Sequence, residues 1–255
     1  MKKVILFIVE GLTDKVALEG IIDGIIGKQY ALDFCVANED ITSCKKNTAG
    51  TIKGTVSTLV EKHLERLSSE DKSVDDLVEE HLAKRNVNRY EKDDIKAIVH
   101  LIDTDGGLIA EKCIETKKKA GDKPLEYFDD KIRVASSGYR GICNRNNTKT
   151  TITKRLSGEH TICGKPYSIY YFSRDREHSL QNENVYGEWP NTSRKRMLAE
   201  EFEDKYIDDP DGFLALLSSI CPSGDYATSW RHIFKETNSL KRFSNFKLFF
   251  DSLAL

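Results

Sequence analysis

Acidic residues follow apolar segments of the sequence at points where strands are expected to end. The apolar run at residues 98–102 is followed by Asp103-Thr-Asp105-Gly, and the run at residues 3–9 is followed by Glu10-Gly. Because side chains alternate along extended backbone, Asp103 and Asp105 point to the same side. Two carboxylates that lie close together repel each other, and a divalent cation would relieve the repulsion. An Asp-Gly turn that only ends a strand is the simpler interpretation of the same residues.

A third predicted strand also ends in acidic residues. Residues 168–172 form an apolar segment, and Asp175 and Glu177 follow it in a short polar stretch. Three strand ends that carry carboxylates in one chain are not expected by coincidence. Open α/β sheets place their ligands at the carboxyl ends of their strands, so this pattern predicts a functional site there.

The N-terminal segment predicts the fold class. Residues 3–9 are a continuous apolar, β-branched run, which is typical of a strand buried on both faces. A helix is expected to begin at Thr13 or Asp14 and to end near Ile26, and a second strand follows at residues 32–36. Strand, helix and strand in this order predict a parallel sheet. The chain has neither a GxGxxG fingerprint after the first strand nor a GxxxxGK[ST] phosphate loop.

The remaining elements predict an α/β fold whose mainly parallel sheet is flanked by helices. A helical insertion is expected at about residues 42–94, and the chain is divided into an α/β domain at residues 1–180 and a C-terminal helical region at residues 181–255, packed on that domain. Further strands are expected at residues 95–102, 131–136 and 168–172, and helices at residues 51–67, 74–83, 109–119, 192–206, 212–220, 229–237 and 245–253.

Composition bounds the class of protein. The chain has 255 residues and a formal net charge of −2, so no global positive field indicates nucleic acid. No apolar run reaches the length of a membrane span. The six cysteines form no CxxC pair, which indicates neither a zinc site nor a disulfide framework. These features predict a cytoplasmic protein with reduced thiols.

One local segment is basic. Residues 131–155 contain seven Lys or Arg and no Asp or Glu, with Tyr139 among them. The Asn/Thr-rich middle, residues 143–153, is expected to be a loop. Two interpretations remain open: a solvated surface hairpin, or a segment that contacts a nucleic-acid backbone.

The acidic motifs resemble those of a known fold. The stretches VEGLTD and LIDTDGG resemble the two motifs of the Toprim fold, which topoisomerases, primases, small nucleases and OLD-family nucleases share. Asp14 and the stretch YYFSRDREHSL resemble the OLD-type branch. The resemblance covers about residues 3–180, which would form the catalytic domain. The stretch NSLKRFSNFKLFF is similar to the C-terminal end of small stand-alone Toprim proteins that accompany an ABC-type ATPase in anti-phage abortive-infection systems.

The resemblance implies roles for six residues. Glu10 would be a metal ligand or general base, Asp103 and Asp105 would hold Mg²⁺ or Mn²⁺, and Asp14, Asp175 and Glu177 would form a second metal position. OLD-type enzymes also resemble one another in a lysine near the scissile phosphate, for which Lys195, Lys205 and Lys241 are candidates. The ATPase of full-length OLD proteins is missing here, so any ATP-dependent control would come from a separate protein.

These roles predict a metal-dependent nuclease. Cleavage of a phosphodiester needs an activated water and charge neutralisation on the leaving oxygen, and two metal ions about 4 Å apart supply both. Hard divalent cations prefer carboxylate oxygens. The substrate is left open between DNA and RNA, tRNA included. The resemblance further implies a toxic effector of anti-phage defence, paired with an ABC-type ATPase, and a homodimer.

Two other functions fit parts of the sequence. In a haloacid-dehalogenase-type phosphatase, which LIDTDGG also resembles, Asp103 would be the nucleophile and Asp105 the acid/base. That motif normally ends the first strand, Glu10 would be unexplained, and the paired acids at 129–130 and 208–209 follow no apolar strand. A non-catalytic Toprim scaffold is the other alternative, although a scaffold does not need unpaired carboxylates at three strand ends.

Overall fold

A five-stranded sheet forms the centre of the computed structural model, which describes residues 2–44, 46–68, 90–117, 125–183 and 192–253. The strand order is β2-β1-β3-β8-β7, and the strands are β1 (Val4–Val9), β2 (Ala31–Val36), β3 (Ile95–Asp103), β7 (Thr161–Ile162) and β8 (Lys165–Phe172). The first four in this order run parallel, and β7 pairs antiparallel with β8. The predicted α/β class with a mainly parallel sheet flanked by helices is therefore confirmed.

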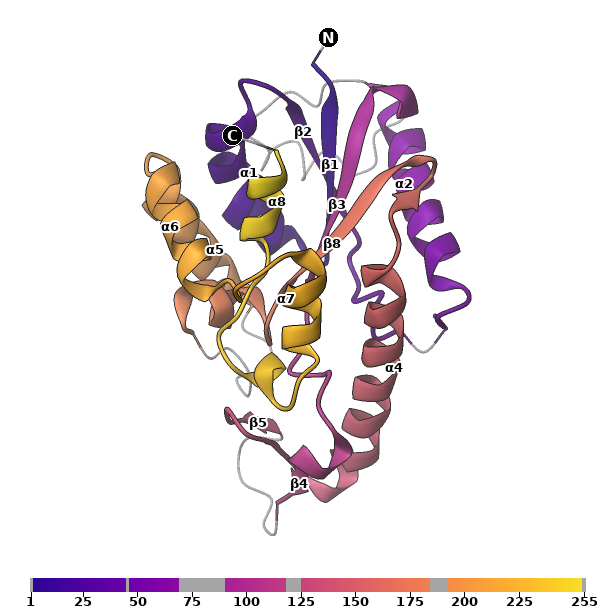
Figure 1. Ribbon diagram of the computed structural model, residues 1–255, viewed down its shortest axis with the longest axis vertical. Helices are drawn as coiled ribbons and strands as arrows, with labels where there is room; N and C mark the ends of the chain where they lie inside the picture. Colours follow the sequence, from indigo (N-terminus) through magenta and orange to yellow (C-terminus); the bar gives the residue numbers. More distant parts are fainter. Residues whose placement is uncertain (1, 45, 69–89, 118–124, 184–191, 254–255) are drawn as a thin grey trace.

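Alternating side chains of β1 divide the interior into two cores. Ile5, Phe7 and Val9 face the helix α1 (Leu12–Ile26), whereas Val4, Leu6 and Ile8 face α2 (Ile52–Ser68) and α4 (Tyr139–Ser157). Figure 1 shows α1 on one side of the sheet and α2 and α4 on the other. Because both faces are covered, all six residues of β1 are buried, as its continuous apolar run predicts.

The C-terminal helices pack on both sides of this sheet. They are α5 (Thr192–Tyr206), α6 (Pro210–Ile220), α7 (Tyr226–Ile233) and α8 (Lys247–Ser252). α5 and α6 pack against α1, and α8 joins that core through its phenylalanines. Trp230 of α7 belongs to the opposite core, where its ring meets Tyr171 of β8 edge-on. The helix predicted at residues 229–237 corresponds to α7, which begins and ends nearer to the N-terminus. The helices predicted at residues 192–206, 212–220 and 245–253 nearly match α5, α6 and α8.

A short backbone segment ties this C-terminal region to the end of β8. Ser173 N–H donates to Phe243 O at 2.9 Å, and Phe243 N–H donates back to Ser173 Oγ at 2.7 Å. Asn245, which is fully buried, accepts from Tyr171 N–H at 2.9 Å and donates to Ser229 Oγ at 3.0 Å. The segment from 239 to 245 thus fixes the direction in which the chain leaves β8.

A second, smaller sheet replaces a helix that the sequence predicts. Its strands are β4 (Ile114–Thr116), β6 (Ile132–Val134) and β5 (Leu125–Tyr127), in that order. The predicted helix at residues 109–119 is wrong: a 3₁₀ turn, Glu111–Cys113, leads directly into β4. The predicted strand at residues 131–136 exists as β6, but it belongs to this sheet. The physical reason is a separate small core into which Ile109, Ile114 and Ile132 are buried.

The predicted loop at residues 143–153 is also wrong, because this segment lies within α4. Its Asn and Thr residues have low helix propensity, yet the helix runs for 19 residues. The reason is a buried stripe at helical spacing that includes Cys143, Lys149, Ile152 and Leu156. Half of the stripe is polar, so the apolar pattern alone did not reveal it. The surface-hairpin interpretation of residues 131–155 is excluded by the same helix.

Other predictions have mixed outcomes. The strand at residues 95–102 and the helix at residues 51–67 match β3 and α2, whereas the helix at residues 74–83 lies outside the described residues. None of the helices in the described ranges combines the length and the apolar character that a bilayer span requires.

We expect Phe246→Ala to lower the free energy of unfolding by about 3–5 kcal/mol, because it empties a fully buried position. The Phe246 ring contacts the rings of Phe7, Tyr170 and Phe250 at centroid distances of 6.4, 6.0 and 5.1 Å. Urea unfolding measures the change. Met197→Ala on α5, where 48% of the side chain is exposed, is the control and should change stability little. Equal losses in the two variants would contradict the assigned core.

Candidate active site

The carboxyl ends of β1, β3 and β8 bring the predicted acidic residues together. Glu10 follows β1, and Asp103 is the last residue of the neighbouring β3. Asp103 N–H donates to Glu10 Oε1 at 3.2 Å. Because Asp103 is also in register with Phe172, the last residue of β8, the turn that carries Asp175 and Glu177 begins beside it.

Burial and mutual repulsion set the protonation of Glu10 and Asp103. Burial of each carboxyl raises its pKa well above the ordinary range. For Asp103, the charges of Glu10, Asp14, Asp175 and Glu177 raise the pKa further. Four of the other five predicted carboxylates therefore act on Asp103. No Lys or Arg in the described part of the chain forms an ion pair with Glu10 or Asp103.

Asp14 lies in the first turn of α1, where a carboxylate is favoured by the helix dipole. Its Oδ2 accepts from Gly11 N–H at 3.1 Å, which caps the helix. Its Oδ1 accepts from Arg176 Nε at 3.1 Å. Burial nevertheless raises the pKa of Asp14, although the Arg176 charge opposes this shift.

Asp105 faces a different partner from Asp103. The ammonium group of Lys149, which is fully buried on α4, donates to an Asp105 carboxylate oxygen and to Asp40 Oδ2, the latter at 2.8 Å. The two carboxylates keep the Lys149 pKa above its ordinary value, and Lys149 in turn holds the pKa of Asp40 well below its usual range. Lys149 therefore stays charged in the interior because two carboxylates compensate it.

The Asp-Gly turn after β3 needs glycine at its second position. Asp105 and Gly106 both have a left-handed backbone, with φ of 49° and 61°. A Cβ at Gly106 would lie 2.5 Å from the Tyr127 ring, far inside van der Waals contact. The turn therefore directs the Asp105 side chain toward α4, where Lys149 lies, while Tyr127 OH donates to Asp105 O at 3.0 Å.

The turn after β8 contains its own cation between the two predicted acids. Arg176 has no exposed surface, and its guanidinium binds Asp14 and Glu177; Nη2 donates to Glu177 Oε1 at 2.7 Å. Asp175 is also buried, and its Oδ1 accepts from His178 N–H at 2.7 Å. Burial, together with the charge of Glu177, raises the pKa of Asp175 to about 7. Its Oδ2 has no hydrogen-bond partner in the described structure.

Of the three lysines that the sequence offers, one lies at the site. Lys195 of α5 places its Nζ 4.0 Å from Glu177 Oε2, with 47% of its side chain exposed. Lys205 instead lies over the Tyr206 ring at 4.8 Å, and Lys241 donates to Asn238 Oδ1 at 3.4 Å. Sequence reasoning missed Lys149, Asp40 and Arg176 as members of the site. No spacing rule links Lys149 and Asp40 to the acidic motifs, whereas Arg176 stands between Asp175 and Glu177, where a search for carboxylates alone overlooks it.

The donor chemistry of the site suits a hard divalent cation, since every predicted ligand is a carboxylate. Asp175 Oδ2 is buried and has no hydrogen-bond partner among the described residues, so a positive ion beside it would also fit. Within the described ranges, however, no group of three or more His, Cys, Asp or Glu is arranged to hold a metal ion in this structure. Lys149 and Arg176 explain part of this, because they already bind Asp105, Asp14 and Glu177.

The basic segment at residues 131–155 is largely paired within the protein. Lys131 and Arg133 both bind Glu115, at 3.2 and 3.3 Å, and Arg155 binds Glu159. Exposed ion pairs of this kind contribute little to stability, but they reduce the positive charge offered to a partner. The segment is therefore less basic as a surface than its composition indicates.

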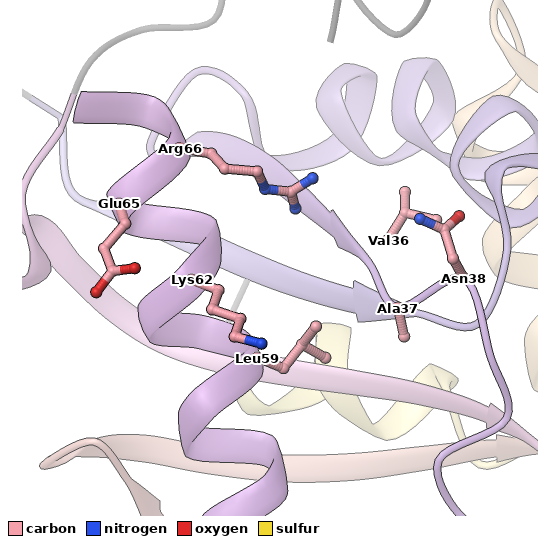
Figure 2. Close-up of a pocket in the computed structure, with 7 residues that line it drawn as sticks. All are labelled: Val36, Ala37, Asn38, Leu59, Lys62, Glu65 and Arg66. Atoms are coloured by element: carbon pink, nitrogen blue, oxygen red, sulfur yellow. The ribbon is translucent and has the colours of Figure 1, made fainter. Parts of the chain in front are cut away.

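A pocket of about 540 Å³ lies where β2 ends, next to α2. The pocket lies next to the end of β1, which Glu10 follows. Ala37, which lines the pocket directly after β2, donates its N–H to Val9 O of β1 at 2.9 Å. Figure 2 shows Lys62 and Arg66 of α2 reaching over this hollow while Glu65 turns away. The lining residues are Val36, Ala37, Asn38, Leu59, Lys62, Glu65 and Arg66, none of which the acidic motifs predict.

Comparisons of the chain with protein-family models, with curated proteins and with solved structures find no match. What the site can do therefore follows from its own residues.

We expect Glu10→Gln to stabilise the protein in EDTA at neutral pH. The folded-state pKa values of Glu10 and Asp103 exceed their ordinary values of 4.5 and 3.8. The stability that these two carboxyls contribute is therefore fully present below about pH 4. It is lost as the pH rises toward their folded-state pKa values. The glutamine side chain would carry no charge and would still accept from Asp103 N–H. Urea unfolding should show a gain of about 1 kcal/mol near pH 7.5 that shrinks toward pH 4.5.

Glu201→Gln on the exposed side of α5 is the matched control and should gain nothing. Asp40 acts in the opposite direction, because its pKa in the folded protein is lower than the ordinary value of 3.8. The stability that Asp40 contributes is present when the pH is above this ordinary value, and it is lost only as the pH falls below it. A Glu10→Gln advantage that grew toward low pH would contradict the assigned charges.

Proposed function

We propose that this chain is a nuclease of the Toprim type that depends on a divalent cation and cleaves phosphodiester bonds in DNA or RNA. The observation that carries the proposal is the convergence of five carboxylates, four at the ends of three neighbouring parallel strands and one, Asp14, in the first turn of α1. The pKa of Asp103 responds to four of the other acids, and Glu10 accepts its amide hydrogen bond. Buried like charges are costly, and sites that keep them are candidates for catalysis.

The site residues divide into those that would hold the cation and those that position them. Glu10 and Asp103 would hold Mg²⁺ or Mn²⁺, whereas Asp105, the further ligand that the sequence predicts, is bound by Lys149. When bound, the ion would supply an activated water and neutralise charge on the leaving oxygen. Lys149 orients Asp105 and compensates Asp40, so it is a positioning residue. Glu10, as the acid nearest to Asp103 N–H, is also placed to accept a proton.

Contacts to the substrate would come from cations at the rim of the site. Lys195 is half-exposed beside Glu177, where an ammonium group would meet an anionic phosphate. Lys62 and Arg66 point over the neighbouring pocket, and phosphate contacts of this kind do not depend on base sequence. This arrangement supports a polyanionic substrate although the net charge of the chain is −2.

The biological setting that we propose rests on the sequence resemblance. It comprises a cytoplasmic toxic effector of anti-phage defence, an ABC-type ATPase as a separate partner, assembly as a homodimer, and tRNA among the substrates.

The structure offers less support for the phosphatase. Such an enzyme has no use for Glu10, which accepts from Asp103 N–H. The second acidic pair that it needs would have to be Asp175 and Glu177 after β8, because Asp129 and Asp130 lie exposed in the turn between β5 and β6. Asp209 instead caps α6, where it accepts from Gly212 N–H at 2.9 Å. The non-catalytic scaffold has no use for carboxylates whose pKa values are raised by burial, since these groups destabilise the fold when ionised.

We expect Glu10→Gln and Asp103→Asn to lower cleavage at least about 100-fold, because each removes a charged ligand of the cation. The assay compares plasmid DNA, single-stranded DNA and total tRNA in Mg²⁺, Mn²⁺ and EDTA. Glu201→Gln is the control and should cleave like the wild type.

Three outcomes separate the candidate functions. Metal-dependent cleavage that both variants lose supports the nuclease and identifies its substrate. Hydrolysis of a phosphate monoester that Asp103→Asn abolishes but Glu10→Gln tolerates would favour the phosphatase. Absence of both activities, also after an ATPase encoded next to this chain is added, would favour the scaffold.

A further inference from the structure

Arg176 is the most completely buried cation on the β8 side of the site, and all of its guanidinium nitrogens have partners. Nε donates to Asp14 Oδ1 at 3.1 Å, Nη2 to Glu177 Oε1 at 2.7 Å and Nη1 to Gln181 Oε1 at 3.2 Å. The backbone holds it there, because a five-residue π-helical turn, Glu177–Gln181, follows directly. The side chain therefore has one arrangement, in which it links α1 to the turn after β8.

Most of the oxygens that would form a second metal position are already bound, and the exception is Asp175 Oδ2, which has no hydrogen-bond partner in the described structure. Asp14 uses Oδ2 for Gly11 N–H and Oδ1 for Arg176, while Glu177 uses Oε1 for Arg176 and has Lys195 4.0 Å from Oε2. A divalent cation between these two residues would meet the guanidinium at contact distance. Arginine does not lose its proton in proteins, so the repulsion could not be relieved by deprotonation.

The pair at the ends of β1 and β3 is different. Glu10 and Asp103 accept no hydrogen bond from a Lys or Arg side chain within the described ranges, and Asp103 lies among four other acids. Among the described residues, one part of the acidic site therefore has no cation in direct contact, although the Lys149 charge acts on Glu10, and the other part contains Arg176. A second ion beside Arg176 does not fit the donor set that this chain presents.

We infer that the guanidinium of Arg176 takes the place of the second divalent cation, so that the chain binds one such ion, between Glu10 and Asp103. The location of that one ion rests on the proposed function; the role of Arg176 rests on its own contacts. Asp14 and Glu177 are then positioning residues, which hold Arg176 beside Asp103. Two-metal chemistry is replaced by one exchangeable cation and one fixed guanidinium.

Manganese-binding stoichiometry tests this directly, without an activity readout. Free Mn²⁺ is measured by electron paramagnetic resonance as the wild type and its variants are titrated. The wild type should bind one Mn²⁺, and Arg176→Gln should bind two, because Asp14 and Glu177 become available. The double variant Arg176→Gln with Glu177→Gln should return to one. Arg194→Gln, which removes a surface pair with Glu183, is the matched control and should bind one.

Each outcome decides the inference. Two ions in the wild type, one of which is lost in Glu177→Gln, would overturn it, as would equal stoichiometry in folded wild type and folded Arg176→Gln. No ion in the wild type but one in Arg176→Gln would support the role of Arg176 and contradict the proposed site at Glu10 and Asp103. If neither protein bound an ion, the result would overturn both the role of Arg176 and the proposed ion site at Glu10 and Asp103.

Arg176→Gln removes the cation that binds Asp14 and Glu177, so circular dichroism must show that it folds. If it does not fold, Glu177→Gln and Asp103→Asn decide in the wild-type background. One Mn²⁺ kept in Glu177→Gln and lost in Asp103→Asn supports the inference. One Mn²⁺ lost in Glu177→Gln overturns it, because the ion would then lie where Arg176 is placed.

Discussion

Repulsion among carboxylates at one edge of the sheet is the constraint on which the site depends. The parallel pairing of β1 and β3 places Glu10 beside Asp103, and the turn after β8 adds Asp175 and Glu177. Burial removes water that would otherwise screen these charges. A stable fold must therefore supply positive charge at this edge or keep some of the carboxyls protonated. The chain does both in part, because Lys149 and Arg176 supply positive charge and the raised pKa values of Glu10 and Asp103 favour their protonated forms.

Two cations on different elements deliver the compensating charge. α4 carries Lys149 to Asp105 and Asp40, and the helix is held there by its buried stripe rather than by helix propensity. The turn after β8 carries Arg176, and the C-terminal segment fixes that turn through the hydrogen bonds between Ser173 and Phe243. The C-terminal region therefore contributes to the site although it supplies few of its charged groups.

The sequence predicts the elements that have a strong local signal. β1, α1, β2 and β3 follow from continuous apolar runs and helical spacing, and the acidic ends of the strands locate Glu10 and Asp103. Lys149 could not be assigned in this way, because its salt bridges to Asp40 and Asp105 join distant parts of the chain and depend on tertiary packing. Arg176 is visible between two acids in the sequence, but its pairing with Asp14 is not. The same holds for residues 109–119, where a small separate core selects a strand over a helix. Polar residues in the buried stripe of α4 hid that helix from the apolar pattern.

The turn after β8 shows why acidic motifs need to be interpreted with their neighbours. Read as Asp175 and Glu177 alone, it predicts a metal position; read as Asp-Arg-Glu, it contains a cation of its own. The π-helical turn directs Arg176 inward, so that its charge reaches Asp14 on another element. A guanidinium cannot be removed by a chelator or by a change in metal concentration. A chain built in this way keeps Asp14 and Glu177 compensated at all times, whereas Glu10 and Asp103 form no ion pair with a Lys or Arg of the described residues.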